Sequence, residues 1–254
     1  SKSLSQLNWL GSLSFGRLLL TLSSRKLALP PRVVCRANVM RLSSYSSSAK
    51  LFRFAAPLLV VAFAVASAVL RRGLGGQPGS LDPQRAEDAF SFDVLRDLYE
   101  GLTTSSPSGE VLPAAAESWS VDETGTRYTF KLRRNARWSN GDPVLARQFV
   151  AALRRAVDPA TASGGADLLR SIENAPAILK GELPADKLAV RAVDDRLLEI
   201  TLSQPVPYFP DILTNTVASP VHDSSLAESG GFSRGGATVS NGAYALAEVV
   251  PGAS

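Results

Sequence analysis

The segment AESWSVDETGTRYTFKLRRNARWSNGDPV, residues 116–144, decides the fold class. Residues 128–132 alternate apolar and polar side chains, which is the period-two pattern of a half-buried strand. Residues 119–121 form a second apolar run, and the polar stretch 122–126 between the two runs has the composition of a tight turn. The segment therefore predicts a β-hairpin.

The hairpin is followed by a turn and an amphipathic helix that ends at Val157. Asp142 is the candidate N-cap and Pro143 the first helical residue. The apolar side chains of the helix recur at helical spacing on one face, and we expect Arg147, Arg154 and Arg155 to form a solvated face. Trp138 has two interpretations, since it could stack on a ligand or pack on the apolar face. Packing is the favoured one.

Outward from this segment the same criteria predict further hairpins and helices. The expected elements are a strand at 69–72, a helix at 93–102, a helix at 166–179 broken at Pro176, a hairpin of 188–193 with 198–202, and a strand at 244–250. No partner for the last strand follows it in the sequence. The fold class is mixed α/β.

The charge is divided between two unlike parts of the 254-residue chain, whose net charge is +4. Residues 1–80 hold eleven Lys and Arg and no acid, while the remainder holds 16 basic and 23 acidic residues, a net charge of −7. The basic balance therefore belongs to the leading segment, and it does not indicate a nucleic-acid partner.

Residues 1–68 are expected to be a leader outside the fold. The first fifty are rich in Ser, and Met40 begins a positively charged stretch that precedes the apolar run 55–70. Sixteen helical residues span about 24 Å, which is short of the roughly 30 Å membrane core. We therefore expect an export signal cleaved after Ala68 and a periplasmic protein. An uncleaved membrane anchor and an organelle-targeting segment are the alternatives.

No catalytic or metal-binding group is expected. The chain has one Cys, one Met and one His, which cannot form a disulfide framework or a His/Cys metal cluster, so we expect no metal and no cofactor. Ser233 lies in a G-x-S-x-G motif, but this motif lacks the preceding strand and following helix that a nucleophile elbow requires. We expect a surface loop at Ser233, a solvent-facing or capping role for His222, and no enzyme activity.

Several segments, read consecutively, resemble the periplasmic oligopeptide-binding proteins, the family 5 extracellular solute-binding proteins of peptide ABC importers. The similar segments are SLDPQRAE (80–87), RDLYEGL (96–102), residues 116–144, FVAALRRAVDPATAS (149–163), VRAVDDRLLEITLSQPVPYF (190–209) and SNGAYAL (240–246). Their order and spacing agree from about Val69 to the end of the sequence.

This resemblance implies the N-terminal lobe of a two-lobed periplasmic-binding-protein fold with an inserted α+β subdomain. Residues 69–102 and 219–254 would form the core of the first lobe, and residues 103–218 the insertion. The second lobe would lie beyond Ser254, so the chain is expected to be a fragment that binds peptides weakly or not at all.

The resemblance also implies a ligand and a site. The ligand would be a short peptide bound in extended form, delivered to an ABC permease by a monomeric protein. Glu87 matches a family position whose carboxylate lies at the ligand cleft, and Ala89 would line the same cleft. Gly165 stands where the family has an aromatic residue, which implies a wider pocket.

Three other functions remain open at this point. The same fold could bind a dipeptide, a nickel chelate or a sugar. An interaction domain without a transport function is supported only by the targeting-like residues 1–50. A serine hydrolase at Ser233 is the least favoured.

Overall fold

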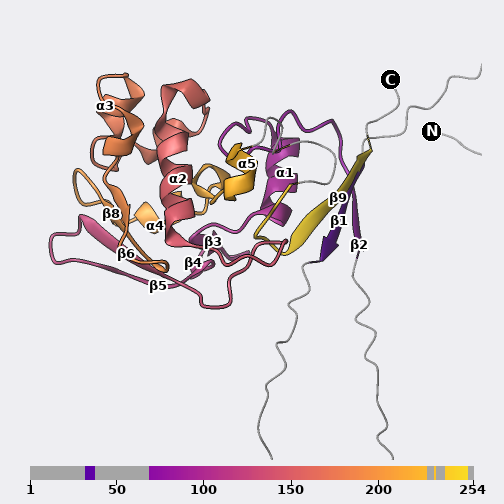
Figure 1. Cartoon of the computed structure of the whole chain (residues 1–254), viewed down its shortest axis with the longest axis horizontal. Helices are drawn as coiled ribbons and strands as arrows, with labels where there is room; N and C mark the ends of the chain where they lie inside the picture. Colours follow the sequence, from indigo (N-terminus) through magenta and orange to yellow (C-terminus); the bar gives the residue numbers. More distant parts are fainter. Residues whose placement is uncertain (1–31, 38–68, 228–231, 233–237, 251–254) are drawn as a thin grey trace, which may run out of the picture.

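The computed structural model describes residues 32–37, 69–227, 232 and 238–250, which form a mixed α/β fold (Figure 1). The strands are β1 Arg32–Ala37, β2 Val69–Gly73, β3 Thr103–Ser105, β4 Val111–Pro113, β5 Ala116–Val121, β6 Arg127–Leu132, β7 Val190–Ala192, β8 Leu197–Thr201 and β9 Tyr244–Val250. The α-helices are α1 Ala89–Leu98, α2 Ala146–Val157, α3 Ala175–Leu179, α4 Phe209–Ile212 and α5 Asp223–Ala227. The short 3-10 turns are η1 Pro159–Thr161, η2 Ala166–Leu169, η3 Ala185–Lys187 and η4 Thr216–Ala218.

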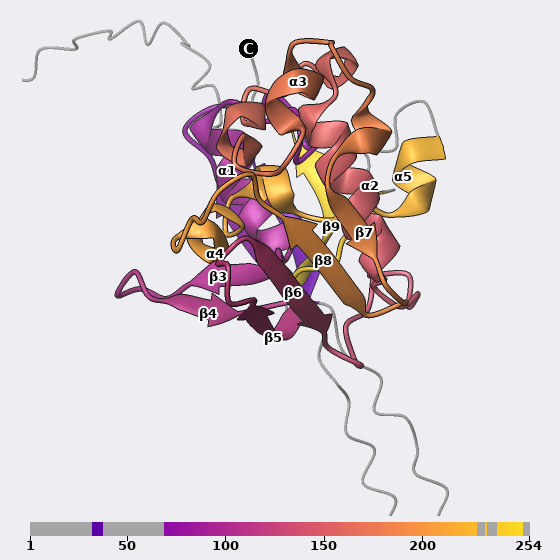
Figure 2. The ribbon, with the colours of Figure 1, turned by 90° about the vertical axis from the view of Figure 1, so that its left-hand side faces the viewer.

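The four-stranded antiparallel sheet β5-β6-β8-β7 confirms both predicted hairpins (Figure 2). Tyr128, Phe130 and Leu132 of β6 are buried, as the alternation predicts. Helix α2 packs on β7 and β8, with Phe149 and Leu153 fully buried on its inner face. The apolar periods of the strands and of the helix thus face one core.

Helix α2 begins later than predicted. Its N-cap is Leu145, whose N–H donates to Oε1 of Gln148 at 2.9 Å, rather than Asp142. Asp142 is held in the preceding turn instead, where its N–H donates to Oδ1 of Asn140 and its carboxylate accepts from Nδ2 of Asn140. The turn competes for the Asp side chain and delays the helix by one turn.

Two other helices also differ from the prediction. Helix α1 spans Ala89–Leu98 rather than 93–102, because Asp88 caps its start by accepting from the Ser91 N–H and Tyr99 is extended. The expected helix 166–179 is divided into η2 and α3, and Pro176 lies in the first turn of α3, where its missing N–H costs nothing. No helix among the residues placed by the structure is long and apolar enough to cross a membrane.

The three-stranded sheet β2-β1-β9 contradicts the expectation that residues 1–68 lie wholly outside the fold. Strand β1, from Arg32 to Ala37, is its central strand and is antiparallel to both neighbours. The partner of the strand 244–250 therefore comes from far upstream in the sequence. The predicted cleavage after Ala68 lies outside the described residues, and the lobe boundaries at 102/103 and 218/219 stay predictions.

A close approach at Asn241 and Gly242 joins the C-terminal strand to the end of α1. The Gly242 N–H donates to the Leu98 carbonyl at 2.7 Å, and Nδ2 of Asn241 donates to the Glu100 carbonyl at 2.8 Å. A Cβ atom on Gly242 would lie 2.6 Å from the Leu98 carbonyl carbon, which is backbone and cannot yield. Only glycine fits this junction.

We predict that Gly242→Ala lowers the free energy of unfolding by about 1–3 kcal/mol, the range for forced overpacking. Gly73→Ala is the matched control, since no atom lies within 4 Å of a Cβ placed there. Urea unfolding of the two variants is the measurement. Equal stability of both variants would contradict the close approach.

We also predict that Glu100→Gln raises stability at about pH 7. Burial raises the pKa of the Glu100 carboxyl, and the charge of Arg133 offsets part of this rise. The folded chain therefore binds the Glu100 proton more tightly than the unfolded chain does. Ionised Glu100 destabilises the fold above its folded pKa, and this penalty vanishes below its unfolded pKa.

The measurement is urea unfolding across pH. The gain from Glu100→Gln should disappear as the pH falls below about 4, near the ordinary Glu pKa. Glu110→Gln, at an exposed position in the β3–β4 turn, is the control and should change stability little. A loss of stability in Glu100→Gln at neutral pH would show that the carboxylate is stabilising.

Candidate binding pocket

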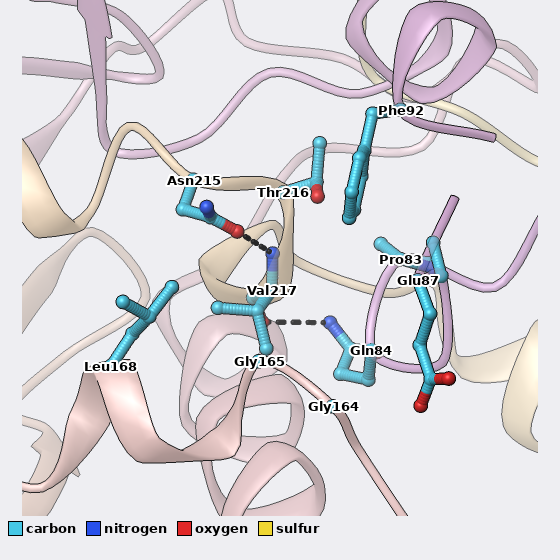
Figure 3. A pocket seen from close by; sticks show the side chains of 11 residues that line it. Pro83, Gln84, Glu87, Phe92, Gly164, Gly165, Leu168, Asn215, Thr216 and Val217 are labelled. Carbon is cyan, nitrogen blue, oxygen red and sulfur yellow. Dashed lines mark hydrogen bonds between the residues drawn. The ribbon is translucent and has the colours of Figure 1, made fainter. Parts of the chain in front are cut away.

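A pocket of about 420 Å³ lies where three segments meet (Figure 3). These are the loop before α1 with the start of α1, the loop between η1 and η2 with η2 itself, and the turn η4 with the residue before it. The lining residues are Pro83, Gln84, Ala86, Glu87, Phe92, Gly164, Gly165, Leu168, Asn215, Thr216 and Val217. The volume is that of a small-molecule or side-chain site.

The pocket is lined by both apolar and polar side chains, and Glu87 is the one charged residue among them. Phe92 and Glu87 lie on one side and Leu168 and Val217 on the other. Glu87 is exposed, and within the described part of the chain no side chain or N–H group bonds its carboxylate. The carboxylate is therefore available to a cationic or hydrogen-bond-donating ligand.

Two adjacent glycines shape the opposite rim. A Cβ atom on Gly164 would lie 2.8 Å from Oε1 of Glu87, and one on Gly165 would lie 3.1 Å from Cβ of Val217. A side chain at either position would displace a neighbour or occupy the cavity. The glycines thus preserve the volume of the pocket and leave room for the Glu87 carboxylate beside Gly164.

The lining residue Gln84 is bonded to a largely buried ion pair between Arg155 and Asp82, neither of which lines the pocket. Arg155 of α2 donates through both terminal nitrogens to the two carboxylate oxygens of Asp82, at 2.7 and 2.5 Å. Nη1 of Arg155 also donates to Oε1 of Gln84 at 2.9 Å. Such a bidentate pair fixes orientation as well as distance.

Gln84 extends this network to the third segment. Its Nε2 donates to the carbonyls of Val217 and Ser219 at 3.2 and 3.0 Å, and its side chain is almost wholly buried. The loop before α1, helix α2 and turn η4 are therefore joined by one set of charged and amide hydrogen bonds. These hydrogen bonds fix the positions of the lining segments relative to one another.

Tyr99 lies within the field of the same ion pair. Burial raises the pKa of its phenol, and the Asp82 carboxylate raises it further while Arg155 opposes. Its hydroxyl is buried and has no hydrogen-bond partner in the part of the protein the structure places. The Tyr99 phenol therefore remains neutral, and its ring packs in the hydrophobic core.

The predicted site residues are only partly brought together. Glu87 and Gly165 both line the pocket, on different segments. Ala89 is the exposed first residue of α1 and is not among the lining residues. Ser233 lies outside the described residues. Among the residues that are described, no group of His, Cys, Asp and Glu could hold a metal ion.

His222 is buried, so the solvent-facing alternative is wrong, but it does cap a helix. It precedes α5, and its Nδ1 accepts from the Ser224 N–H at 3.2 Å. Its Nε2 lies 3.0 Å from Oδ2 of Asp142, and its ring contacts Trp138 edge to face at 5.2 Å. The ring is therefore structural.

Trp138 follows the favoured packing interpretation. It is 2% exposed, and its indole N–H donates to Oε1 of Gln148 at 2.8 Å.

The prediction for Arg155 is wrong, because this residue is paired with Asp82 and does not lie on a solvated face. The periodicity of α2 indicated its outward side, but Asp82 is too distant in sequence for any local pattern to reveal the pairing.

The comparisons with known proteins agree on one group. The family model described as "Bacterial extracellular solute-binding proteins, family 5 Middle" matches residues 110–254. The chain is 41% identical over 184 residues to the periplasmic oligopeptide-binding protein OppA of Escherichia coli (strain K12), covering 71% of this chain and 34% of that protein. It is 42% identical over 181 residues to a protein of the same organism named "Probable deoxycholate-binding periplasmic protein YgiS", covering 70% and 34%.

Solved structures give the same result. The structure of Haemophilus influenzae OppA in complex with RPPGFSPFR is similar with a TM-score of 0.67 and 38% identity, covering 70% of this chain and 35% of that one. The Escherichia coli murein tripeptide binding protein MppA is similar with a TM-score of 0.66 and 37% identity, covering 70% and 37%. The chain spans about a third of the length of the curated relatives it matches.

We predict that Asp82→Asn lowers the free energy of unfolding by about 3 kcal/mol, the lower end for breaking a buried pair, since Arg155 keeps some exposure. The control is Asp167→Asn, whose partner Arg170 lies 3.7 Å away on the surface. That exposed pair should contribute about 0–1 kcal/mol. Urea unfolding measures the loss of stability in each variant. Similar losses in the two would show that the Asp82–Arg155 pair stabilises the fold no more than a surface pair does.

Proposed function

The chain belongs to family 5 of the bacterial extracellular solute-binding proteins, and on this premise we propose that it captures short peptides as the substrate-binding component of an ABC importer. The single observation that carries the proposal is the pocket in which Glu87 lies against Gly164 and Gly165 lies against Val217. The proposed role is binding and delivery, without catalysis.

The lining of the pocket supports a peptide side chain as the occupant. Phe92, Leu168 and Val217 offer apolar contact, while the amide of Asn215 and the carboxylate of Glu87 offer polar contacts at the rim. Oε1 of Glu87 lies next to Gly164 and carries no partner among the described residues, so it is within reach of an incoming cationic side chain. Peptides with a Lys or Arg side chain are the favoured ligands.

The names of several relatives support the cellular context. They describe periplasmic peptide-binding proteins, and one structural neighbour is titled as part of an oligopeptide ABC transporter. We infer that the whole protein acts in the periplasm as a monomer and delivers its ligand to a membrane permease.

A second candidate ligand is an amphipathic acid such as deoxycholate. The name of one relative favours it, and the apolar walls at Phe92 and Leu168 would suit a steroid. The Glu87 carboxylate opposes it, because two like charges would meet at the rim. A direct comparison of the two ligands decides between them.

The test is a titration of the full chain, followed by amide chemical shifts, which detect even millimolar binding. We expect Ala-Lys-Ala to shift the amides of Glu87, Gly164, Gly165 and Thr216 more strongly than Ala-Glu-Ala or deoxycholate does. Glu87→Gln should weaken Ala-Lys-Ala binding by about two- to fivefold, the factor that an exposed ion pair gives.

Glu110→Gln is the matched control, since this carboxylate is exposed in the β3–β4 turn and does not line the pocket. It should leave the titration unchanged. Shifts that are spread over the chain, or an equal response to the Lys and Glu peptides, would overturn the assignment of the pocket. A stronger response to deoxycholate would favour the second candidate.

A further inference from the structure

The sheet β2-β1-β9 has its two outer strands held to the body of the protein independently of its central strand. In β2, Arg72 pairs with Asp97 of α1 at 3.2 Å, and Leu70 packs against the core. In β9, Leu246 is buried in the core, and the N–H of Gly242, two residues before the strand, donates to the Leu98 carbonyl of α1 at 2.7 Å. None of these contacts involves β1.

The outer strands do not pair with each other. Each is hydrogen-bonded in this sheet only to β1, so their facing edges stand two strand spacings apart, about 9.5 Å. Such a gap admits one extended strand and leaves unpaired N–H and C=O groups on both sides if it is empty. The anchored edges therefore define a slot for a single backbone.

The occupant pairs with β9 along its whole length and with β2 at every residue except Ala37. On the β2 side the register runs from Arg32 opposite Gly73 to Arg36 opposite Val69. On the β9 side it runs from Arg32 opposite Val250 to Ala37 opposite Tyr244, with a register shift between Val34 and Cys35. Recognition in this arrangement is by backbone hydrogen bonds on two sides.

We propose that the gap between β2 and β9 is a strand-binding site for an extended peptide segment, distinct from the pocket, and that residues 32–37 are its resident occupant. Residues 38–68 tether this segment to β2, so it binds intramolecularly and at a high effective concentration. Because the edges are anchored separately, the segment is exchangeable for a peptide supplied in trans. Cleavage between β1 and β2 would convert the tethered occupant into such a peptide.

The first test uses Val34→Pro in the full chain. Val34 is paired on both sides, and proline removes its N–H and clashes within a ladder. We expect the amides of 69–73 and 244–250 to exchange about tenfold faster or more, while those of β6 and β8 keep their protection. Ser47→Pro, within the tether, is the control and should change neither sheet.

Adding the peptide RVVCRA, which has the sequence of residues 32–37, should restore protection in Val34→Pro, whereas RVPCRA should not. Unchanged exchange in Val34→Pro, or failure of RVVCRA to restore it, would overturn the proposal. The signal is read on β2 and β9, which do not line the pocket, so a failure of the pocket assignment would leave this result intact.

A second measurement avoids the proline. A site-specific protease sequence placed at residues 42–49 allows the tether to be cut after folding, without a change in β1. The fragment that contains residues 32–37 should remain bound in size-exclusion chromatography and be displaced by excess RVVCRA. Immediate dissociation would overturn the proposal, and protection that rises with protein concentration would assign the strand to a second copy instead.

Discussion

The buried pair between Asp82 and Arg155 is the contact on which the arrangement of the pocket depends. It joins the loop before α1 to the C-terminal end of α2, and through Gln84 it reaches the turn η4. The three lining segments are loops and helical elements, so no sheet fixes their positions relative to one another. Desolvated charges tolerate little displacement, because each partner left alone would be buried unpaired. The Asp82–Arg155 pair therefore fixes the positions of the segments that line the pocket.

Local patterns in the sequence predicted most of the four-stranded sheet. The alternation over 128–132 and the hairpin near 194–196 depend on neighbouring residues, and both are present. The start of α2 was missed because Asp142 satisfies its turn and His222, a contact made 80 residues away. The central strand β1 was missed because composition assigned it to a leader. Composition cannot reveal which edges an upstream segment will pair with.

The site was predicted less fully than the fold. Glu87 and Gly165 came from the family resemblance, and they do face one cavity. Ala89 did not, because the N-cap at Asp88 starts α1 there and leaves its first residue in solvent. Gln84 and Arg155 gave no local signal, since a polar residue in a loop and a basic residue on a helix are ordinary on a surface. Their burial is a property of the assembled segments.

The long sequence separation between Gln84 and its hydrogen-bond partners also affects when the pocket can form during synthesis. The Gln84 amide bonds to Val217 and Ser219, which lie 133 and 135 residues further along the chain. A ribosome adding about 5–20 residues per second needs roughly 7 to 27 s to supply them. The hairpins between them are local and can pair within that time. The loop that carries Glu87 cannot make these bonds until Val217 and Ser219 have been synthesised, so the pocket is among the last parts of the nascent chain to fold.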